Sequence, residues 1–217
     1  MNSKRNSDIR RITGKDLKEK AKPTGNFVPV EIDNVYELCQ VMGEFFYGKK
    51  HEWIAVCFLD ENFRCKLIWF NKGADHRSVP LLITPGEAIS IAKSNHLKYL
   101  IIMHNHPLSS KIIPDYGTRR RNIEARYFYK EQLRDFSGAD KASARSWSDS
   151  LKMEGIGYAD VVFVAGDYRI EGDKEIIKNL KSNRPFLEKL GTPGGCLSWT
   201  LLISISIVCV ALGIILN

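Results

Sequence analysis

Residues 99–107 read Tyr99-Leu-Ile-Ile-Met-His-Asn-His-Pro107, an apolar strand pattern that ends in a His-x-His motif. Residues at i and i+2 of a strand point to the same face, so His104 and His106 can converge while Asn105 faces away. Pro107 ends the strand because it has no N–H group for the ladder. Neutral imidazole is a good zinc ligand, and zinc needs at least one further protein ligand and an open position before it can do chemistry. The motif therefore predicts part of a metal site, unless the histidines are chance neighbours on a half-exposed strand.

The chain around this motif alternates between strand and helix patterns. Apolar runs and turn residues predict strands at 26–32, 53–59, 64–71, 99–103 and 160–165. Helical spacing predicts a helix capped by Asp33 or Asn34, another that Thr84-Pro-Gly-Glu87 opens and that runs over 88–95, and a third at 174–181. The order indicates one α/β domain of the mixed α+β kind over 26–185.

Both ends of the 217-residue chain differ from this core. Residues 1–25 are basic and polar, so we expect a flexible lead without a signal peptide. Residues 186–195 form a Gly/Pro-rich linker, and 196–217 carry no charged side chain. That last segment is long enough for a transmembrane helix, with a buried core helix as the alternative. Basic residues before the span place the domain in the cytoplasm, so we expect a single-pass, tail-anchored membrane protein.

The net charge indicates which partners suit the protein, and the cysteine spacing indicates the redox state of its compartment. A formal net charge of +7 suits anionic lipid or nucleic acid, and an anchored domain makes lipid the simpler choice. The cysteines are odd in number and lack Cys-x-x-Cys spacing: Cys39, Cys57, Cys65, Cys196 and Cys209. They are typical of thiols in a reducing compartment and do not suggest a disulfide framework or a zinc knuckle.

Several features follow one another along residues 50–170. They are Glu52-Trp-Ile-Ala-Val-Cys-Phe-Leu-Asp60, Gly73, Pro85 before a helix, and His104-Asn-His-Pro107. Together they resemble the JAB/MPN metallopeptidase superfamily, and within it the RadC-like branch. The resemblance implies a cytidine-deaminase-like core with helices flanking a central mixed sheet. It also implies the JAMM motif, in which an upstream glutamate, His-x-His and Ser-x-x-Asp build a zinc site.

The Ser-x-x-Asp part of the motif is displaced in this chain. The places where the family has its serine and aspartate fall on Pro114 and Gly117, and Asp115 has Ile112 where a serine is needed. Two candidates lie farther on, Ser137-Gly-Ala-Asp140 and Ser146-Trp-Ser-Asp149.

The register of Gly155-Ile156 and Asp160 against the family pattern favours Ser137 and Asp140, because Ser146 would leave little more than one helical turn before Gly155. Ser137 is also a good N-cap, with Asp140 at N3. Asp149 is the second choice for the metal ligand. A Ser-x-x-Asp sequence is also an ordinary capping box, so the capping role alone is the competing explanation.

Carried onto this chain, the resemblance implies metal ligands His104, His106 and Asp140, with Glu52 and Ser137 as catalytic residues. Glu52 would be the general base, and it fits the family spacing to Asp60 better than Glu44, which lies in the preceding helix. The implied protein is a membrane-anchored zinc metallopeptidase that hydrolyses a peptide or isopeptide bond through a zinc-activated water. Its substrate would be a protein or peptide, such as a ubiquitin-like conjugate.

Residues 108–136 form an insertion beside the expected site. Its basic residues alternate with aromatic ones, which suits a lid, a substrate-binding helix or a contact with single-stranded nucleic acid. A solvated basic helix is an equally good interpretation. Two other functions therefore stay open: a RadC-like DNA-associated protein, and an MPN-type scaffold without catalytic activity.

Overall fold

The computed structural model describes residues 12–75, 79–108, 118, 120, 121, 132 and 135–185. The beginning of the basic lead, most of the 108–136 insertion including Asp115, the linker 186–195 and the predicted span 196–217 lie outside these residues. Within the described part of the chain, no helix has the length and apolar character needed to cross a bilayer.

The described residues form a six-stranded mixed sheet in the order β1-β3-β2-β4-β5-β6. The strands are β1 (Asn26–Ile32), β2 (Trp53–Leu59), β3 (Cys65–Lys72), β4 (Tyr99–Asn105), β5 (Gly157–Val164) and β6 (Asp167–Gly172). All neighbouring pairs are antiparallel except β4 and β5, which are parallel. Every residue of β2 and β4 is buried, which explains why their sequences are almost continuously apolar.

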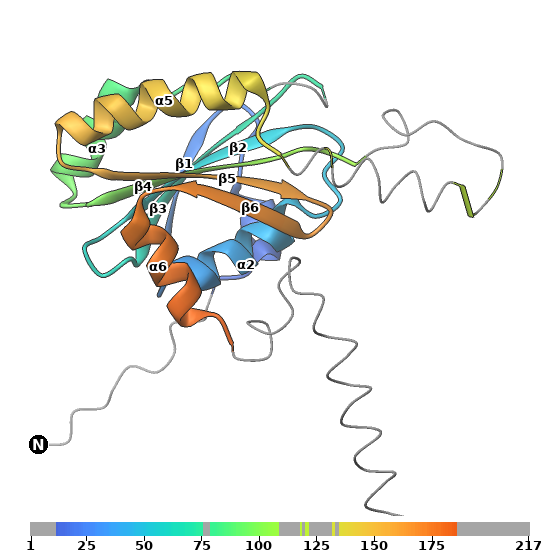
Figure 1. Ribbon diagram of the computed structural model, residues 1–217, viewed down its shortest axis with the longest axis horizontal. Coiled ribbons are helices and arrows are strands. Elements are labelled where there is room, and N and C mark those ends of the chain that lie inside the picture. The colour runs from blue at the N-terminus through green and yellow to red at the C-terminus, as the bar shows by residue number, and fades with distance from the viewer. Residues whose placement is uncertain are drawn as a thin grey trace, which may run out of the picture. The chain divides into compact units, whose positions relative to one another are not determined.

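Helices cover both faces of the sheet (Figure 1). The helices α3 (Pro85–Ser94) and α5 (Gly138–Met153) lie on one face, and α2 (Val35–Phe46) and α6 (Lys174–Asn183) lie on the other. Two separate apolar cores correspond to the two faces. Successive residues of a strand point to opposite faces, and in β4 Ile101 and Met103 enter one core while Leu100 and Ile102 enter the other. This three-layer arrangement confirms the mixed α/β class expected from the sequence.

The helix starts follow the capping signals in the sequence. Asn34 caps α2, and its side chain accepts a hydrogen bond from the Glu37 N–H. Thr84 and Glu87 form a capping box at the start of α3, with Pro85 as its first residue. The predicted helix at 88–95 therefore begins three residues earlier than expected and ends one residue earlier.

Two elements differ from the sequence-based prediction. The expected flexible lead, residues 1–25, contains the helix α1 (Gly14–Lys20), because Leu17 is fully buried in the core formed with α2. Few apolar residues signalled this helix, which Thr13 and Asp16 cap and which Leu17 anchors in the core. The strand β6 was not predicted, since it is an edge strand with mostly exposed residues and so lacks an apolar pattern.

Candidate metal centre

The crossover between the parallel strands β4 and β5 brings the proposed ligands together. A helix in such a crossover runs antiparallel to the strands, so its first turn lies near the C-terminal end of the strand that precedes it. His104 is the second-to-last residue of β4, His106 follows the strand, and Asp140 lies in the first turn of α5. The 108–136 insertion lengthens the chain between the histidines and Asp140, but it does not change the position of the first turn of α5 near the end of β4.

The three side chains converge on one point. The Nε2 atoms of His104 and His106 are 3.2 Å apart. Asp140 Oδ1 lies 3.5 Å from His104 Nε2, and Asp140 Oδ2 lies 3.6 Å from His106 Nε2. Tetrahedral coordination with bonds of about 2.0–2.1 Å separates neighbouring ligand atoms by about 3.3 Å. Two imidazoles and a carboxylate in this arrangement are close enough to hold a metal ion.

Ser137 fixes the orientation of Asp140 through the capping box of α5. The Ser137 Oγ accepts a hydrogen bond from the Asp140 N–H at 3.1 Å, and the Ser137 N–H donates to Asp140 Oδ2 at 2.7 Å. The Ser137-x-x-Asp140 sequence therefore caps α5 and at the same time places Asp140 beside the histidines. A carboxylate held at the first turn of a helix also faces the positive end of the helix dipole.

Asp160 is a buried carboxylate behind His104 that sequence reasoning used only as a landmark. Its Oδ1 lies 3.7 Å from His104 Nδ1, and this atom is buried without a hydrogen-bond partner. Histidines that bind a metal through Nε2 commonly hold their Nδ1–H against a carboxylate, which fixes the ring and its tautomer. Asp160 is in the right place for this function. A buried carboxylate oxygen without a hydrogen-bond partner lowers the stability of a protein, and support of a metal-binding histidine would explain why this one is present.

Glu52 directly precedes β2, in which Ile54 pairs with His104 of β4, so Glu52 lies at the end of the sheet that carries the two histidines. Its backbone is held by two hydrogen bonds, from its own N–H to Asp75 O at 2.9 Å and from the Gly73 N–H to its carbonyl oxygen at 2.8 Å. Its side chain is buried, and this burial raises the pKa of Glu52 to about 7. The charges of His106 and His104 act in the opposite direction and favour the carboxylate. A carboxyl group with a pKa near neutrality can both accept and return a proton.

Asn105, between the two histidines, ties β4 to the segment that carries Glu52. Its Oδ1 accepts a hydrogen bond from the Trp53 N–H at 2.8 Å, and its Nδ2 donates to His51 O at 3.2 Å. The side chain is 3% exposed, so water cannot replace these bonds. The middle residue of the His-x-His motif thus points away from the ligands, as predicted, and fixes the backbone on both sides of Glu52.

Replacing Asn105 with alanine is expected to displace Glu52 and to lower the free energy of unfolding by about 1–3 kcal/mol, since it leaves the buried backbone groups without partners. Denaturant unfolding and the rate of peptide hydrolysis would measure the two effects. The matched control is Asn71→Ala, because Asn71 is also buried and donates to Pro80 O at 2.7 Å, away from the ligands. Equal losses of hydrolysis in the two variants would contradict a special function for Asn105.

The carboxylates around His104 decide its charge in the metal-free protein. Burial opposes the imidazolium form, but the nearby carboxylates of Asp140 and Asp160 outweigh it and raise the pKa of His104 to about 10. Burial likewise opposes the charge of Asp140, yet the bonds from both histidines hold its pKa well below its usual range. At neutral pH the metal-free site is therefore an ion pair, with a proton where a metal ion would bind.

Metal binding should consequently release a proton from His104, because a ligand imidazole must be neutral. We expect the affinity for Zn²⁺ to rise roughly tenfold per pH unit between pH 7 and 9. Calorimetric titration of the metal-free chain in buffers of different ionisation enthalpy measures the number of protons released. A release that is indistinguishable from zero at pH 7.5 would contradict a protonated His104.

The alternative ligand Asp149 does not join this group. It lies nine residues after Asp140 on α5 and is exposed, which at 1.5 Å per residue places it about 13 Å farther along the helix axis. The other alternative, Asp115, lies outside the described residues.

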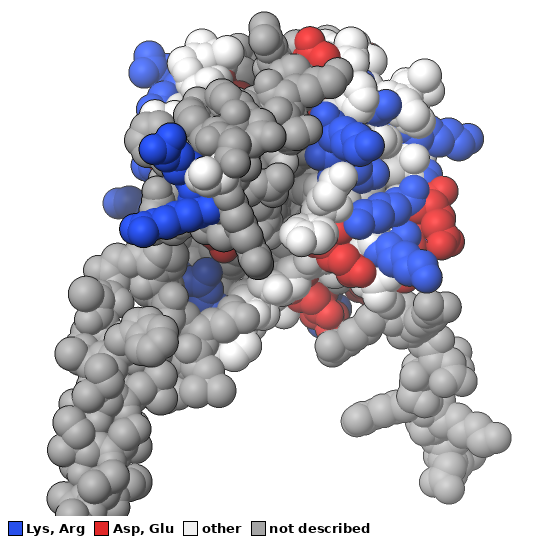
Figure 2. All heavy atoms as spheres, turned by 90° about the vertical axis from the view of Figure 1, so that its right-hand side faces the viewer, with Lys and Arg blue, Asp and Glu red and all other residues white. Residues whose placement is uncertain are grey.

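Charged side chains of both signs surround the side of the molecule toward which β4 runs. Figure 2 shows Lys and Arg on both flanks of this face, with Asp and Glu next to the basic residues mainly on one flank. Among the described residues, Arg169 forms ion pairs with Asp135 and with Glu171. The described residues of this face therefore carry charges of both signs.

Comparisons with models of protein families and with curated proteins give no match to this chain.

Proposed function

We propose that the protein is a zinc metallopeptidase of the JAB/MPN type, RadC-like branch, which hydrolyses a peptide or isopeptide bond. The observation that carries the proposal is the convergence of His104, His106 and Asp140 within coordination distance of one point, beside the buried carboxyl group of Glu52. The proposal includes a cytidine-deaminase-like core and a tail anchor at residues 196–217, with the domain in the cytoplasm.

The donor set supports zinc over other common metal ions. Two imidazole nitrogens and one carboxylate oxygen match the three-ligand sites of hydrolytic zinc enzymes. Mg²⁺ and Ca²⁺ prefer sites made of oxygen ligands only, and no cysteine belongs to this group among the described residues. Zinc held by these three residues would act as a Lewis acid and lower the pKa of a water molecule to about 7.

The surrounding residues supply the remaining chemistry. Glu52, deprotonated above its pKa of about 7, accepts the proton of the attacking water and passes it to the leaving amine. Ser137 orients the developing oxyanion with its hydroxyl group, as the resemblance implies. Asp160 keeps the His104 ring in place through Nδ1, and Asn105 keeps the backbone around Glu52 in place.

The test is the metal content of the full chain purified in detergent, together with its hydrolysis of a mixture of unmodified peptides. We expect about one zinc per chain, a loss of hydrolysis after chelation, and recovery when Zn²⁺ is added. A native protein that contains no metal and does not bind added Zn²⁺ would overturn the proposal and favour the scaffold without catalytic activity.

A further inference from the structure

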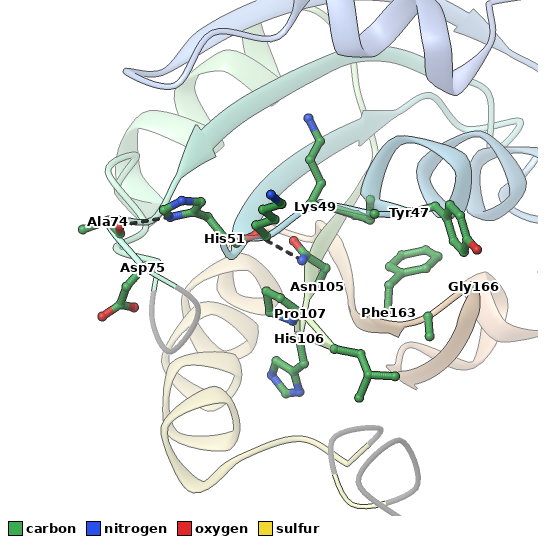
Figure 3. A pocket seen from close by; sticks show the side chains of 16 residues that line it. Tyr47, Lys49, His51, Ala74, Asp75, Asn105, His106, Pro107, Phe163 and Gly166 are labelled. Carbon is green, nitrogen blue, oxygen red and sulfur yellow. Dashed lines mark hydrogen bonds between the residues drawn. The ribbon is translucent and has the colours of Figure 1, made fainter. Parts of the chain in front are cut away.

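A pocket of about 720 Å³ lies on the α2 side of the sheet edge where β4 ends. Its size is within the range of pockets that hold small ligands or peptide side chains. Figure 3 shows Tyr47, Phe163 and Gly166 on one side and His51, Ala74 and Asp75 on the other, with Asn105, His106 and Pro107 between them. We call this space the α2 pocket.

One end of the α2 pocket is apolar and is kept open by small residues. Phe46 and Phe163 form its floor with their rings 5.2 Å apart, and both are almost completely buried. Gly43 and Gly166 line the wall, and a Cβ atom at Gly43 would lie 3.5 Å from the Phe163 ring. Side chains at these positions would therefore project into the space that a ligand would occupy.

The other end of the α2 pocket reaches the proposed catalytic residues. His106, one of the three metal ligands, is part of its wall. Two further lining residues flank Glu52: His51 precedes it in the chain, and Asp75 accepts the hydrogen bond from the Glu52 N–H. A substrate peptide bound across the sheet edge at the end of β4 would thus have its scissile bond near Glu52 and His106. The side chain of the residue after that bond would enter the pocket.

The lysine at the rim does not turn the α2 pocket into an anion site. The Lys49 Nζ lies 4.4 Å from the centre of the Phe45 ring and 4.3 Å from that of Trp53. Figure 3 shows the Lys49 side chain pointing away from His106. Its ammonium group is therefore occupied by aromatic faces outside the pocket. Lys50 and Asp75 line the polar part of the pocket, and the end formed by Phe46 and Phe163 is the part suited to an apolar side chain.

We propose that the α2 pocket binds the side chain of the residue that supplies the leaving amine, and that this residue is large and apolar, such as leucine or phenylalanine. The inference rests on the proposed function, because Glu52 must lie beside the amine to which it returns the proton. Two lining residues, His51 and Asp75, adjoin Glu52, and the proposal therefore assigns the pocket to the side of the bond whose amine Glu52 protonates. A leucine or phenylalanine residue in a linear peptide brings a branched or aromatic apolar side chain to this floor, whereas an isopeptide-linked lysine brings only an unbranched methylene chain that leads to its polar backbone.

Binding of two thiol probes to the Co²⁺-loaded full chain tests the inference without requiring turnover. Mercaptoacetyl-leucinamide and mercaptoacetyl-glycinamide offer the same thiolate to the metal and differ only in the side chain that follows. Thiolate bound to Co²⁺ is followed by its charge-transfer absorption. We expect the leucine probe to bind about 10- to 100-fold more tightly, the gain from burying one leucine side chain.

Filling the pocket should remove this difference. In Gly43→Leu we expect the two probes to bind within about threefold of each other, whereas Gly86→Leu should keep the preference for leucine. Gly86 is the matched control because it also lies in a helix, α3, and its Cβ position is open and outside the pocket. If Gly43→Leu does not fold, Tyr47→Ala serves instead, since Tyr47 is 66% exposed at the rim and its loss should weaken the preference by about threefold or more.

The outcomes separate the two proposals. Equal affinity of the wild-type protein for both probes, with clear absorption, would overturn the assignment of the α2 pocket and leave the metal centre intact. If neither probe gives the thiolate–Co²⁺ charge-transfer absorption, the metal centre and the pocket assignment are both overturned. A leucine preference that survives in both Gly43→Leu and Tyr47→Ala would also overturn the assignment, because the side chain would then bind elsewhere.

Discussion

Replacing Asp140 with alanine is expected to lower the affinity for Zn²⁺ by more than about 100-fold and to abolish hydrolysis at micromolar metal. A group in the second coordination sphere typically contributes 10- to 100-fold to metal affinity, and a direct ligand contributes more. Asp140 lies 3.5 and 3.6 Å from the two histidine nitrogens, and the other acidic residue of α5, Asp149, is exposed and about two and a half turns farther along the helix. Metal content after dialysis against a weak chelator measures the effect.

The control for this variant lies on the same helix. Asp149→Ala removes an identical charge from an exposed position of α5, and we expect metal content and hydrolysis to remain at wild-type levels. Because Asp140 also belongs to the capping box of Ser137, Asp140→Asn should accompany the alanine variant. The amide oxygen keeps the bond from the Ser137 N–H, so metal loss in Asp140→Asn would not be a capping effect. Retained zinc in both Asp140 variants, with loss in Asp149→Ala, would refute the ligand assignment.

Replacing Glu52 with glutamine should leave the zinc content unchanged and reduce the rate of hydrolysis by about 100- to 10,000-fold, the usual contribution of a positioned acid–base group. Glutamine has the same shape but cannot carry a proton between water and the leaving amine. Steady-state hydrolysis at fixed metal occupancy measures the loss. Glu44→Gln is the matched control, because Glu44 accepts a hydrogen bond from the Gly14 N–H at 2.8 Å, which an amide oxygen can also accept. Similar losses in both variants would exclude Glu52 as the proton carrier.

The same glutamate should also leave a signature in the stability of the metal-free protein. Burial raises the pKa of Glu52 from 4.5 to about 7, so the folded state holds its proton more tightly than the unfolded chain does. The resulting stabilisation is complete below pH 4.5 and is lost as the pH rises to about 7. Glu52→Gln should flatten this part of the pH profile of the unfolding free energy. An unchanged slope would mean that Glu52 is already ionised in the folded protein.

Most of the framework of the site could be predicted from local patterns. The apolar run before His104, the capping signals of Asn34, Thr84 and Ser137, and the i, i+2 relation of the histidines all act over a few residues, and the structure agrees with them. The helix α1 and the strand β6 were missed because their apolar content is low. Leu17 is the one large apolar side chain that α1 buries, so no apolar periodicity indicated this helix.

The sequence by itself determined the mixed α/β class, the central strand and the pair of histidines at its end, because hydrophobic burial and strand geometry are local properties. It favoured Asp140 over Asp149 and Asp115 as the third ligand but did not exclude them, since separation along the chain does not determine distance in space. The tertiary structure alone decided that Asp140 faces both histidines, because a parallel crossover returns the first turn of α5 to the end of β4. It alone placed Asp160 behind His104 and joined Asn105 to the backbone on both sides of Glu52, since these contacts cross from one strand to the next.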